Sequence, residues 1–249
     1  MTTGKRAWLR YVASLRKVND IAAGKFLAFM NTHPNATNDQ LIEAAFALAT
    51  KYGEAAAELA CQMYDATAAA SGMLLEPAVP AATATMDEVA RAVVGTAKTG
   101  SSEITSGAVG RLVKMAGVDT TMQNAVRDGA EWAWIPQGGT CAFCIALASR
   151  GWQPASRAQM KGNHAEHIHA NCDCTFQIRF NDTDTVEGYD PERYREIYDD
   201  AEGRSSAAKI NSMRREAYAD TKDRLERRGV SEAEKRIVLN SSAAEEIVV

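Results

Sequence analysis

The sequence predicts a mainly α-helical protein that begins with a long helical hairpin and contains one small α+β module. Alanine is abundant, whereas the 249 residues include only 17 glycines and 6 prolines, a composition that favours helix over sheet. Apolar side chains recur at helical spacing over residues 5–31 and 39–71. The pattern changes at residue 130, beyond which short strand-like runs flank a cluster of cysteines and histidines.

The first predicted domain, residues 1–72, consists of two helices joined by a turn at 32–35. Thr37 and Gln40 have the spacing of a capping box, which marks the start of the second helix. Two long helices joined by a short turn form an antiparallel hairpin. The first helix is rich in Lys and Arg. A run of charges on a helix is usually a face exposed to solvent, so this interpretation is favoured over a surface that binds DNA or a partner. Cys61, in the second helix, is expected to be a buried structural thiol.

Residues 73–86 are predicted to be a linker because Pro77 and Pro80 block a continuous helix. A middle helical segment, 87–129, follows the linker. Its helices are expected at 87–98, 104–116 and 119–129.

Residues 130–183 are predicted to form the α+β module. A strand is expected at 131–135, and the alternation of apolar and polar residues at 175–180 predicts a second, half-buried strand. The last domain, 184–249, is expected to hold helices and a tail. Its helices are predicted at 191–203, with Asp190 as the N-cap, at 206–228 and after Ser231, and the tail 241–249 has no predicted fold.

Charge and hydropathy exclude several protein classes. The net charge is −4, so the chain as a whole is not built to coat nucleic acid. Arg10, Arg16 and Lys17 interrupt the apolar run that a signal peptide needs, and no stretch approaches the ~18 apolar residues of a membrane span. A soluble protein made in a reducing cytoplasm is expected. In a reducing compartment, closely spaced cysteines indicate metal ligands or redox groups rather than disulfides.

Four of the five cysteines and three of the four histidines gather in one segment: Cys141, Cys144, His164, His167, His169, Cys172 and Cys174. Zinc takes four tetrahedral nitrogen or sulfur ligands, which usually arrive as two close pairs. Cys141 and Cys144 form one pair on a tight turn, at the start of a short predicted helix. The second pair is His169 with Cys172, or Cys174 in place of either one. The sequence therefore predicts one structural Zn²⁺ site.

The cluster also resembles two other kinds of site, a dithiol redox site and the zinc site of a deaminase. A dithiol redox site is disfavoured because the βαβ surroundings of such sites are missing. His164-Ala-Glu166 matches half of a zinc deaminase signature, but here the C-x-x-C precedes it, and Thr140 replaces the usual proline. Four protein ligands also leave no open position for an activated water. A zinc-dependent nucleic-acid-modifying enzyme therefore stays the alternative, and no catalytic residue is assigned.

A family resemblance is carried by three segments: Trp132-Ala-Trp-Ile-Pro136, Cys141-Ala-Phe-Cys144 with its continuation to Gly151, and His169-x-x-Cys-Asp-Cys174. The acidic, aromatic run from Tyr189 to Tyr198 and the helix from Tyr52 to Tyr64 extend it. Together they resemble the minor capsid (head morphogenesis) proteins of tailed bacteriophages related to phage Mu protein F, especially the actinobacterial-phage branch. Ile168 and Asn171 depart from the aromatic residue and second histidine of many relatives, which leaves the histidine ligand open.

The resemblance implies a virion protein that is not an enzyme. It implies a place in the capsid interior or at the portal vertex, after assembly in the host cytoplasm. The implied partners are the portal, the major capsid protein and packaged double-stranded DNA, with self-association as a further option and no membrane contact. Zinc would hold together a module whose core is too small to fold unaided.

Overall fold

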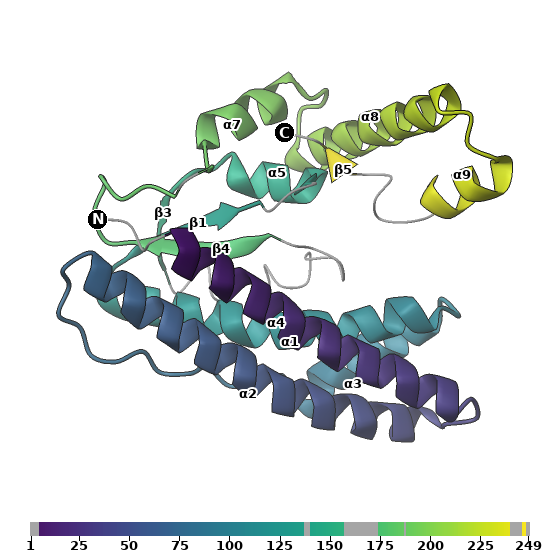
Figure 1. The fold of residues 1–249 in the computed structure, drawn as a ribbon, viewed down its shortest axis with the longest axis horizontal. Helices are drawn as coiled ribbons and strands as arrows, with labels where there is room; N and C mark the ends of the chain where they lie inside the picture. Colours follow the sequence, from purple (N-terminus) through teal and green to yellow (C-terminus); the bar gives the residue numbers. More distant parts are fainter. Residues whose placement is uncertain (1–4, 137–139, 157–173, 187, 240–245, 248–249) are drawn as a thin grey trace. The chain divides into compact units, whose positions relative to one another are not determined.

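The computed structural model describes residues 5–136, 140–156, 174–186, 188–239 and 246–247. This part of the chain is mainly helical, as predicted, with eight helices and two small sheets (Figure 1). The helices are α1 (Lys5–Thr32), α2 (Asn38–Ala70), α3 (Met86–Ala97), α4 (Ser102–Asp128), α5 (Ala142–Ala148), α7 (Pro191–Asp200), α8 (Ser206–Arg227) and α9 (Glu232–Leu239). The strands are β1 (Glu131–Ile135), β2 (Thr140–Cys141), β3 (Gln153–Pro154), β4 (Thr175–Arg179) and β5 (Glu246–Ile247).

The chain divides into two compact units, which we call the helical unit and the cysteine unit. The helical unit comprises Met1–Trp132, Pro154–Asn171 and Ile178–Glu187, and the cysteine unit comprises Ala133–Gln153, Cys172–Gln177 and Gly188–Val249. Strands β1 and β4 each begin in one unit and end in the other. Among the helices that the structure describes, none is long and apolar enough to cross a membrane.

The predicted N-terminal hairpin is present, and α1 and α2 lie side by side (Figure 1). The capping box at the start of α2 is also confirmed. The backbone N–H of Gln40 donates to Oγ1 of Thr37 at 3.3 Å, and the backbone N–H of Thr37 donates to Oε1 of Gln40 at 2.9 Å. These two bonds satisfy amides that the first turn of a helix otherwise leaves unpaired.

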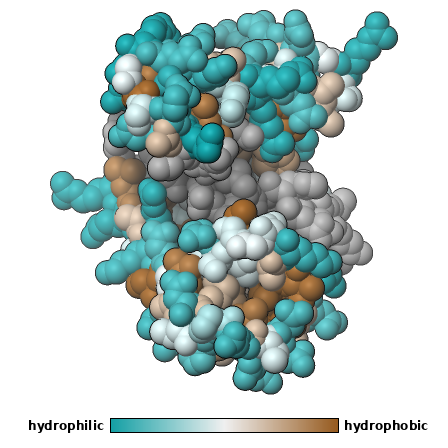
Figure 2. All heavy atoms as spheres, turned by 90° about the vertical axis from the view of Figure 1, so that its right-hand side faces the viewer, coloured by the Kyte–Doolittle hydropathy of each residue, from teal (hydrophilic) through white to brown (hydrophobic). Residues whose placement is uncertain are grey.

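The core of the helical unit is formed by all four long helices, since α4 packs against α1, α2 and α3. One apolar cluster takes residues from each helix: Phe26, Ala45, Ala49, Val89, Val93 and Val109. A second cluster joins α1, α2 and α4 through Leu15, Ala22, Ala56 and Val113. The lower half of Figure 2 faces the end of the unit where α1 ends and α2 begins, and apolar side chains show there between hydrophilic ones.

Helix α4 is continuous, whereas the sequence predicted separate stretches at 104–116 and 119–129. The glycine at the predicted break, Gly117, lies within the helix. A Cβ atom there would meet the backbone oxygen of Ala56 at 3.2 Å, so this glycine allows α4 to approach α2 closely. Helix α4 ends at Gly129, whose φ of 69° is a left-handed conformation that glycine adopts without strain.

The core of the cysteine unit forms where α5 packs against α7 and α8. Its buried residues are Ala142, Ile145, Ala148, Tyr194, Ala201 and Met213. The N-terminus of α7 matches the predicted cap, because Oδ1 of Asp190 accepts a hydrogen bond from the backbone N–H of Glu192 at 3.1 Å.

Two details of the strands differ from the prediction. Strand β4 was expected to be half-buried, but its polar residues Thr175 and Gln177 are buried together with Phe176 and Ile178. The tail was expected to have no fold, but β5 pairs antiparallel with β2, in the register Thr140↔Ile247 and Cys141↔Glu246. The tail therefore returns to the segment that carries the first predicted metal ligand.

Candidate functional site

Three of the five predicted metal ligands lie in the described part of the chain, and all three are buried. Cys141 is 7% exposed, Cys144 is fully buried and Cys174 is 2% exposed. The other two predicted ligands, His169 and Cys172, lie outside the described residues, as do His164, Glu166 and His167.

Cys141 and Cys144 occupy the start of α5. Cys141 is the residue that precedes the first helical turn, with an extended backbone (φ −71°, ψ 155°), and its side chain makes no capping hydrogen bond. Cys144 stands three residues later. Side chains at these two positions of a helix start can reach the same space, as they do in a capping box. The C-x-x-C spacing therefore allows both side chains to reach one side of the helix start.

Cys174 lies next to the same core through Tyr194. The Tyr194 ring packs with Ala142 and Ile145 of α5. Burial raises the pKa of the Tyr194 hydroxyl, and its electrostatic interaction with the nearby Cys174 side chain raises that pKa further. The residue immediately before β4 and the start of α5 thus both border the core of the cysteine unit.

The donor chemistry of these residues suits zinc, because zinc favours thiolate sulfur and no disulfide joins the described cysteines to one another. However, among the residues that the structure describes, no three Cys, His, Asp or Glu side chains gather in a way that could hold a metal ion. Cys141 and Cys144 can supply two ligands. A zinc ion bound there would need further ligands from segment 157–173, which lies outside the described residues.

The helical unit contains a cavity that sequence reasoning missed. Its volume is about 570 Å³, and it lies between α3, α4 and residues 82–85. The lining combines the apolar Leu112 and Met115 with four charged residues: Glu88, Arg91, Arg111 and Asp119. Arg111, Met115 and Asp119 follow a four-residue spacing on one helix face, a signal that the predicted break in α4 concealed.

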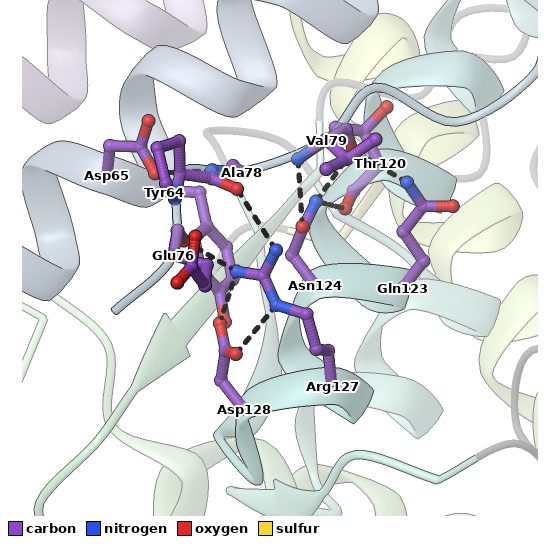
Figure 3. A network of polar contacts seen from close by, with 11 residues as sticks. Tyr64, Asp65, Glu76, Ala78, Val79, Thr120, Gln123, Asn124, Arg127 and Asp128 are labelled. Atoms are coloured by element: carbon purple, nitrogen blue, oxygen red, sulfur yellow. Dashed lines mark hydrogen bonds and ion pairs between the residues drawn. The ribbon is translucent and has the colours of Figure 1, made fainter. Parts of the chain in front are cut away.

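Residues 73–86, predicted as a linker, are bound along α4 by side chains at helical spacing (Figure 3). Oδ1 of Asn124 accepts from the N–H of Val79 at 3.0 Å, and its Nδ2 donates to the oxygen of Val79 at 2.9 Å. Oγ1 of Thr120 accepts from the N–H of Ala81 at 2.9 Å. The segment is therefore held through its backbone, which fixes one wall of the cavity.

The other end of this segment is bound by Arg127. Its guanidinium donates to the oxygen of Glu76 at 2.8 Å and to the oxygen of Pro77 at 3.0 Å (Figure 3). The same group pairs with Asp128 at 2.7 Å, and this hydrogen bond lowers the pKa of the Asp128 carboxyl. The hydroxyl of Tyr64 donates to the same carboxylate at 2.8 Å, so α2, α4 and the segment share one polar network.

Comparison with known proteins decides the family. A family model described as VG15 protein matches residues 2–201. The chain belongs to the VG15 protein family. This is a family of phage proteins, which confirms the phage origin that the sequence resemblance implied. A comparison with curated proteins and one with solved structures each gave no significant match.

The VG15 match covers both parts of the candidate site. It includes α1 to α5, all five predicted zinc ligands and α7, and it ends before α8. The polar network and the cavity, which lie between residues 64 and 128, also fall within it. Helices α8 and α9 and strand β5 lie beyond the matched residues.

Asn124→Ala is expected to lower the free energy of unfolding of this VG15-family chain by about 2 kcal/mol, because it leaves the N–H of Val79 without its acceptor. Gln123→Ala is the matched control. Gln123 is partly exposed, and its side-chain amide donates to the Val79 oxygen, which also accepts from Asn124, so a loss of about 0.5 kcal/mol or less is expected. Urea unfolding followed by circular dichroism measures both. Equal losses would show that the segment is not held as described.

Asp119 is expected to titrate above the usual range. Partial burial of its carboxyl, and then the charge of Glu88, raise the pKa of Asp119 from 3.8 to about 6, although the residue is accessible from the cavity. The folded state then holds the proton more tightly than the unfolded chain. This stabilising contribution is complete below about pH 4 and is lost as the pH rises through 6.

Asp119→Asn removes this pH dependence. The variant should match the natural chain near pH 4 and exceed its stability near pH 7.5, by less than about 1 kcal/mol because solvent screens the accessible carboxyl. Thermal unfolding across this pH range measures the difference, and carbon NMR of the Asp119 carboxyl measures the pKa directly. A carboxyl that titrates near pH 4 would contradict the assignment.

Proposed function

We propose that this VG15-family protein is a minor structural component of the phage head, which acts in head morphogenesis through contacts with the portal, the capsid or packaged DNA. The observation that carries the proposal is the family match over residues 2–201, which makes the chain a phage protein. The resemblance of the segments around Cys141, Cys144 and Cys174 to minor capsid proteins related to phage Mu protein F supplies the finer role.

We propose that the segment of residues 130–183 binds one structural Zn²⁺. Cys141 and Cys144 would supply one ligand pair, and two of His169, Cys172 and Cys174 would supply the other. The buried sulfur atoms at the start of α5 and beside the same core support this proposal. Zinc, when bound, would cross-link segments far apart in the sequence and so stabilise a small core.

The proposed role is assembly rather than catalysis. Four protein ligands fill the tetrahedral shell of zinc, so no coordination position would be open to a water molecule. The alternative of a deaminase-like enzyme depends on His164 and Glu166, which lie outside the described residues. Nothing in the described part favours it.

The test uses the phage that encodes this chain. Particles are purified on a density gradient and analysed by quantitative mass spectrometry. The chain is expected in mature virions at far lower abundance than the major capsid protein. Interruption of its gene should lower the yield of infectious particles, with head defects visible by electron microscopy. Detection in the infected cell but not in purified heads or virions would overturn the proposal.

A further inference from the structure

The exposed side of α1 carries a row of cations that we call the basic face. It consists of Arg6, Arg10, Lys17 and Lys25. Side chains that are four, seven or eight residues apart lie on the same side of a helix, so this spacing places the four cations in one stripe. All four residues are exposed, and Asp20 is the only acidic residue of α1.

The exposed side of α2 carries the opposite charge along a comparable stripe, which we call the acidic face. It consists of Asp39, Glu43, Glu54 and Glu58. These residues again recur at helical intervals. Lys51, the only basic residue of α2, is eight residues from Glu43 and seven from Glu58 and lies on the same side of the helix, so the face keeps a net negative charge with one cation within it. At 1.5 Å per residue, each stripe is about 30 Å long.

The two faces lie on adjacent helices of one hairpin, yet they do not neutralise each other. None of their eight residues forms an ion pair with another residue that the structure describes. Arg16 and Asp20, which are not part of either face, pair at 4.0 Å within α1 itself. Each molecule thus presents one basic and one acidic stripe, both accessible to solvent.

We propose that the basic face of one molecule binds the acidic face of a second copy of this chain. The partner is a second copy because the chain itself carries the complementary surface, of similar length and opposite charge. Since the two faces are different surfaces, the contact is head-to-tail and leaves one face of each molecule open for a further copy. Such a contact produces rings or open chains rather than closed two-fold dimers.

Duplex DNA fits these surfaces less well. DNA binding depends on cations that neutralise phosphates, and carboxylates next to those cations repel the phosphates. The acidic face lies on α2, which packs against α1, so its carboxylates weaken the attraction of the hairpin for phosphates, whereas a second copy of the chain would use both faces. The contact is a property of the isolated chain and does not depend on the proposed place in the phage head.

The contact is expected to be weak and sensitive to salt, because both faces are solvent-exposed and ions screen such charges. Sedimentation velocity of the full chain should show concentration-dependent association at about 50 mM NaCl and its loss at about 500 mM NaCl, where the screening length is well below 10 Å.

Charge-reversed variants identify the surfaces. The first variant reverses the basic face with Arg6→Glu, Arg10→Glu and Lys17→Glu. The second reverses the acidic face with Glu43→Lys, Glu54→Lys and Glu58→Lys. Circular dichroism first verifies that each is folded, as expected for exposed positions. Each variant alone should be monomeric, because both of its faces then carry the same sign. A mixture of the two should associate as the natural chain does, because reversed faces complement each other.

The control for net charge reverses three exposed cations of α8 and its C-cap: Arg215→Glu, Lys222→Glu and Arg228→Glu. This variant should self-associate like the natural chain. A natural chain that stays monomeric at low salt and high concentration would overturn the proposal. So would either face variant that associates like the natural chain, or a face-variant mixture that stays monomeric. Salt-sensitive DNA binding that the first variant loses, without self-association of the natural chain, would instead assign the basic face to DNA.

Discussion

Removal of zinc is expected to unfold the cysteine unit while the helices of the helical unit remain folded. Binding of a structural zinc is worth on the order of 10 kcal/mol in small zinc-finger peptides, which is comparable to the whole stability of a typical domain. The cysteine unit has a small core around α5, α7 and α8, whereas the helical unit has two clusters that join its long helices. The unit with the smaller core should therefore depend on the metal.

Elemental analysis of the purified chain should give one zinc per molecule. A chelator should then remove one part of the thermal unfolding profile, and hydrogen exchange should locate the loss in residues 133–153 and 188–239 rather than in α1–α4. Cys144→Ser is expected to lose most of the zinc, because serine is a poor ligand for this metal. Its buried hydroxyl adds a further, smaller cost.

Cys61→Ala is the matched control for the zinc experiment. Cys61 is also a buried cysteine, but it lies in α2, and burial raises the pKa of its thiol, which disfavours the metal-binding thiolate. The control should keep a full complement of zinc. A natural chain without zinc, or a Cys144→Ser chain with the natural zinc content, would remove the basis of the metal proposal.

Gly117→Leu is expected to destabilise the helical unit by about 3 kcal/mol, since overpacking of a close contact typically costs 1–3 kcal/mol and sometimes more. A Cβ at this position already meets the backbone oxygen of Ala56 at 3.2 Å and the side chain of Leu15 at 3.5 Å. Backbone atoms cannot turn aside as a flexible side chain does. A leucine would therefore force α4 away from α2 and open the core around Ala56 and Val113.

Gly95→Leu is the size-matched control. Gly95 also lies within a helix, α3, but a Cβ there has no neighbour within 4 Å. The same change should stabilise the chain by about 0.5–1 kcal/mol, because leucine has the higher helix propensity. Urea unfolding measures both variants. A loss of similar size in both would show that the effect comes from the glycine itself and not from the contact between α2 and α4.

Local sequence was sufficient to predict where two of the helices begin. The capping box of Thr37 and Gln40 at the start of α2 and the cap formed by Asp190 at the start of α7 each involve residues within four positions of one another. The first turn of a helix leaves backbone amides unpaired, and in both cases a side chain close in the sequence accepts a hydrogen bond from one of them. These predictions are confirmed for that reason.

Distant contacts account for the predictions that were wrong. Gly117 has the pattern of a helix break, and only its approach to Ala56 explains why α4 continues through it. Strand β4 alternates as a half-buried strand does, but both of its faces are covered in the fold. The tail pairs with β2, which lies far from it in the sequence, so no local pattern marked β5 in advance.

The features of the candidate site also separate into those that local sequence determines and those that depend on distant contacts. The sequence by itself determined that Cys141 and Cys144 are separated by two residues at the start of a helix, and from this local geometry it predicts a ligand pair. Only the tertiary structure decided that both are buried beside the core of Tyr194, that the segment from Glu76 to Ala81 is held along α4, and that a cavity forms next to Asp119. The reason is physical: burial, backbone hydrogen bonds between remote segments and cavity walls exist only after distant parts of the chain have come together.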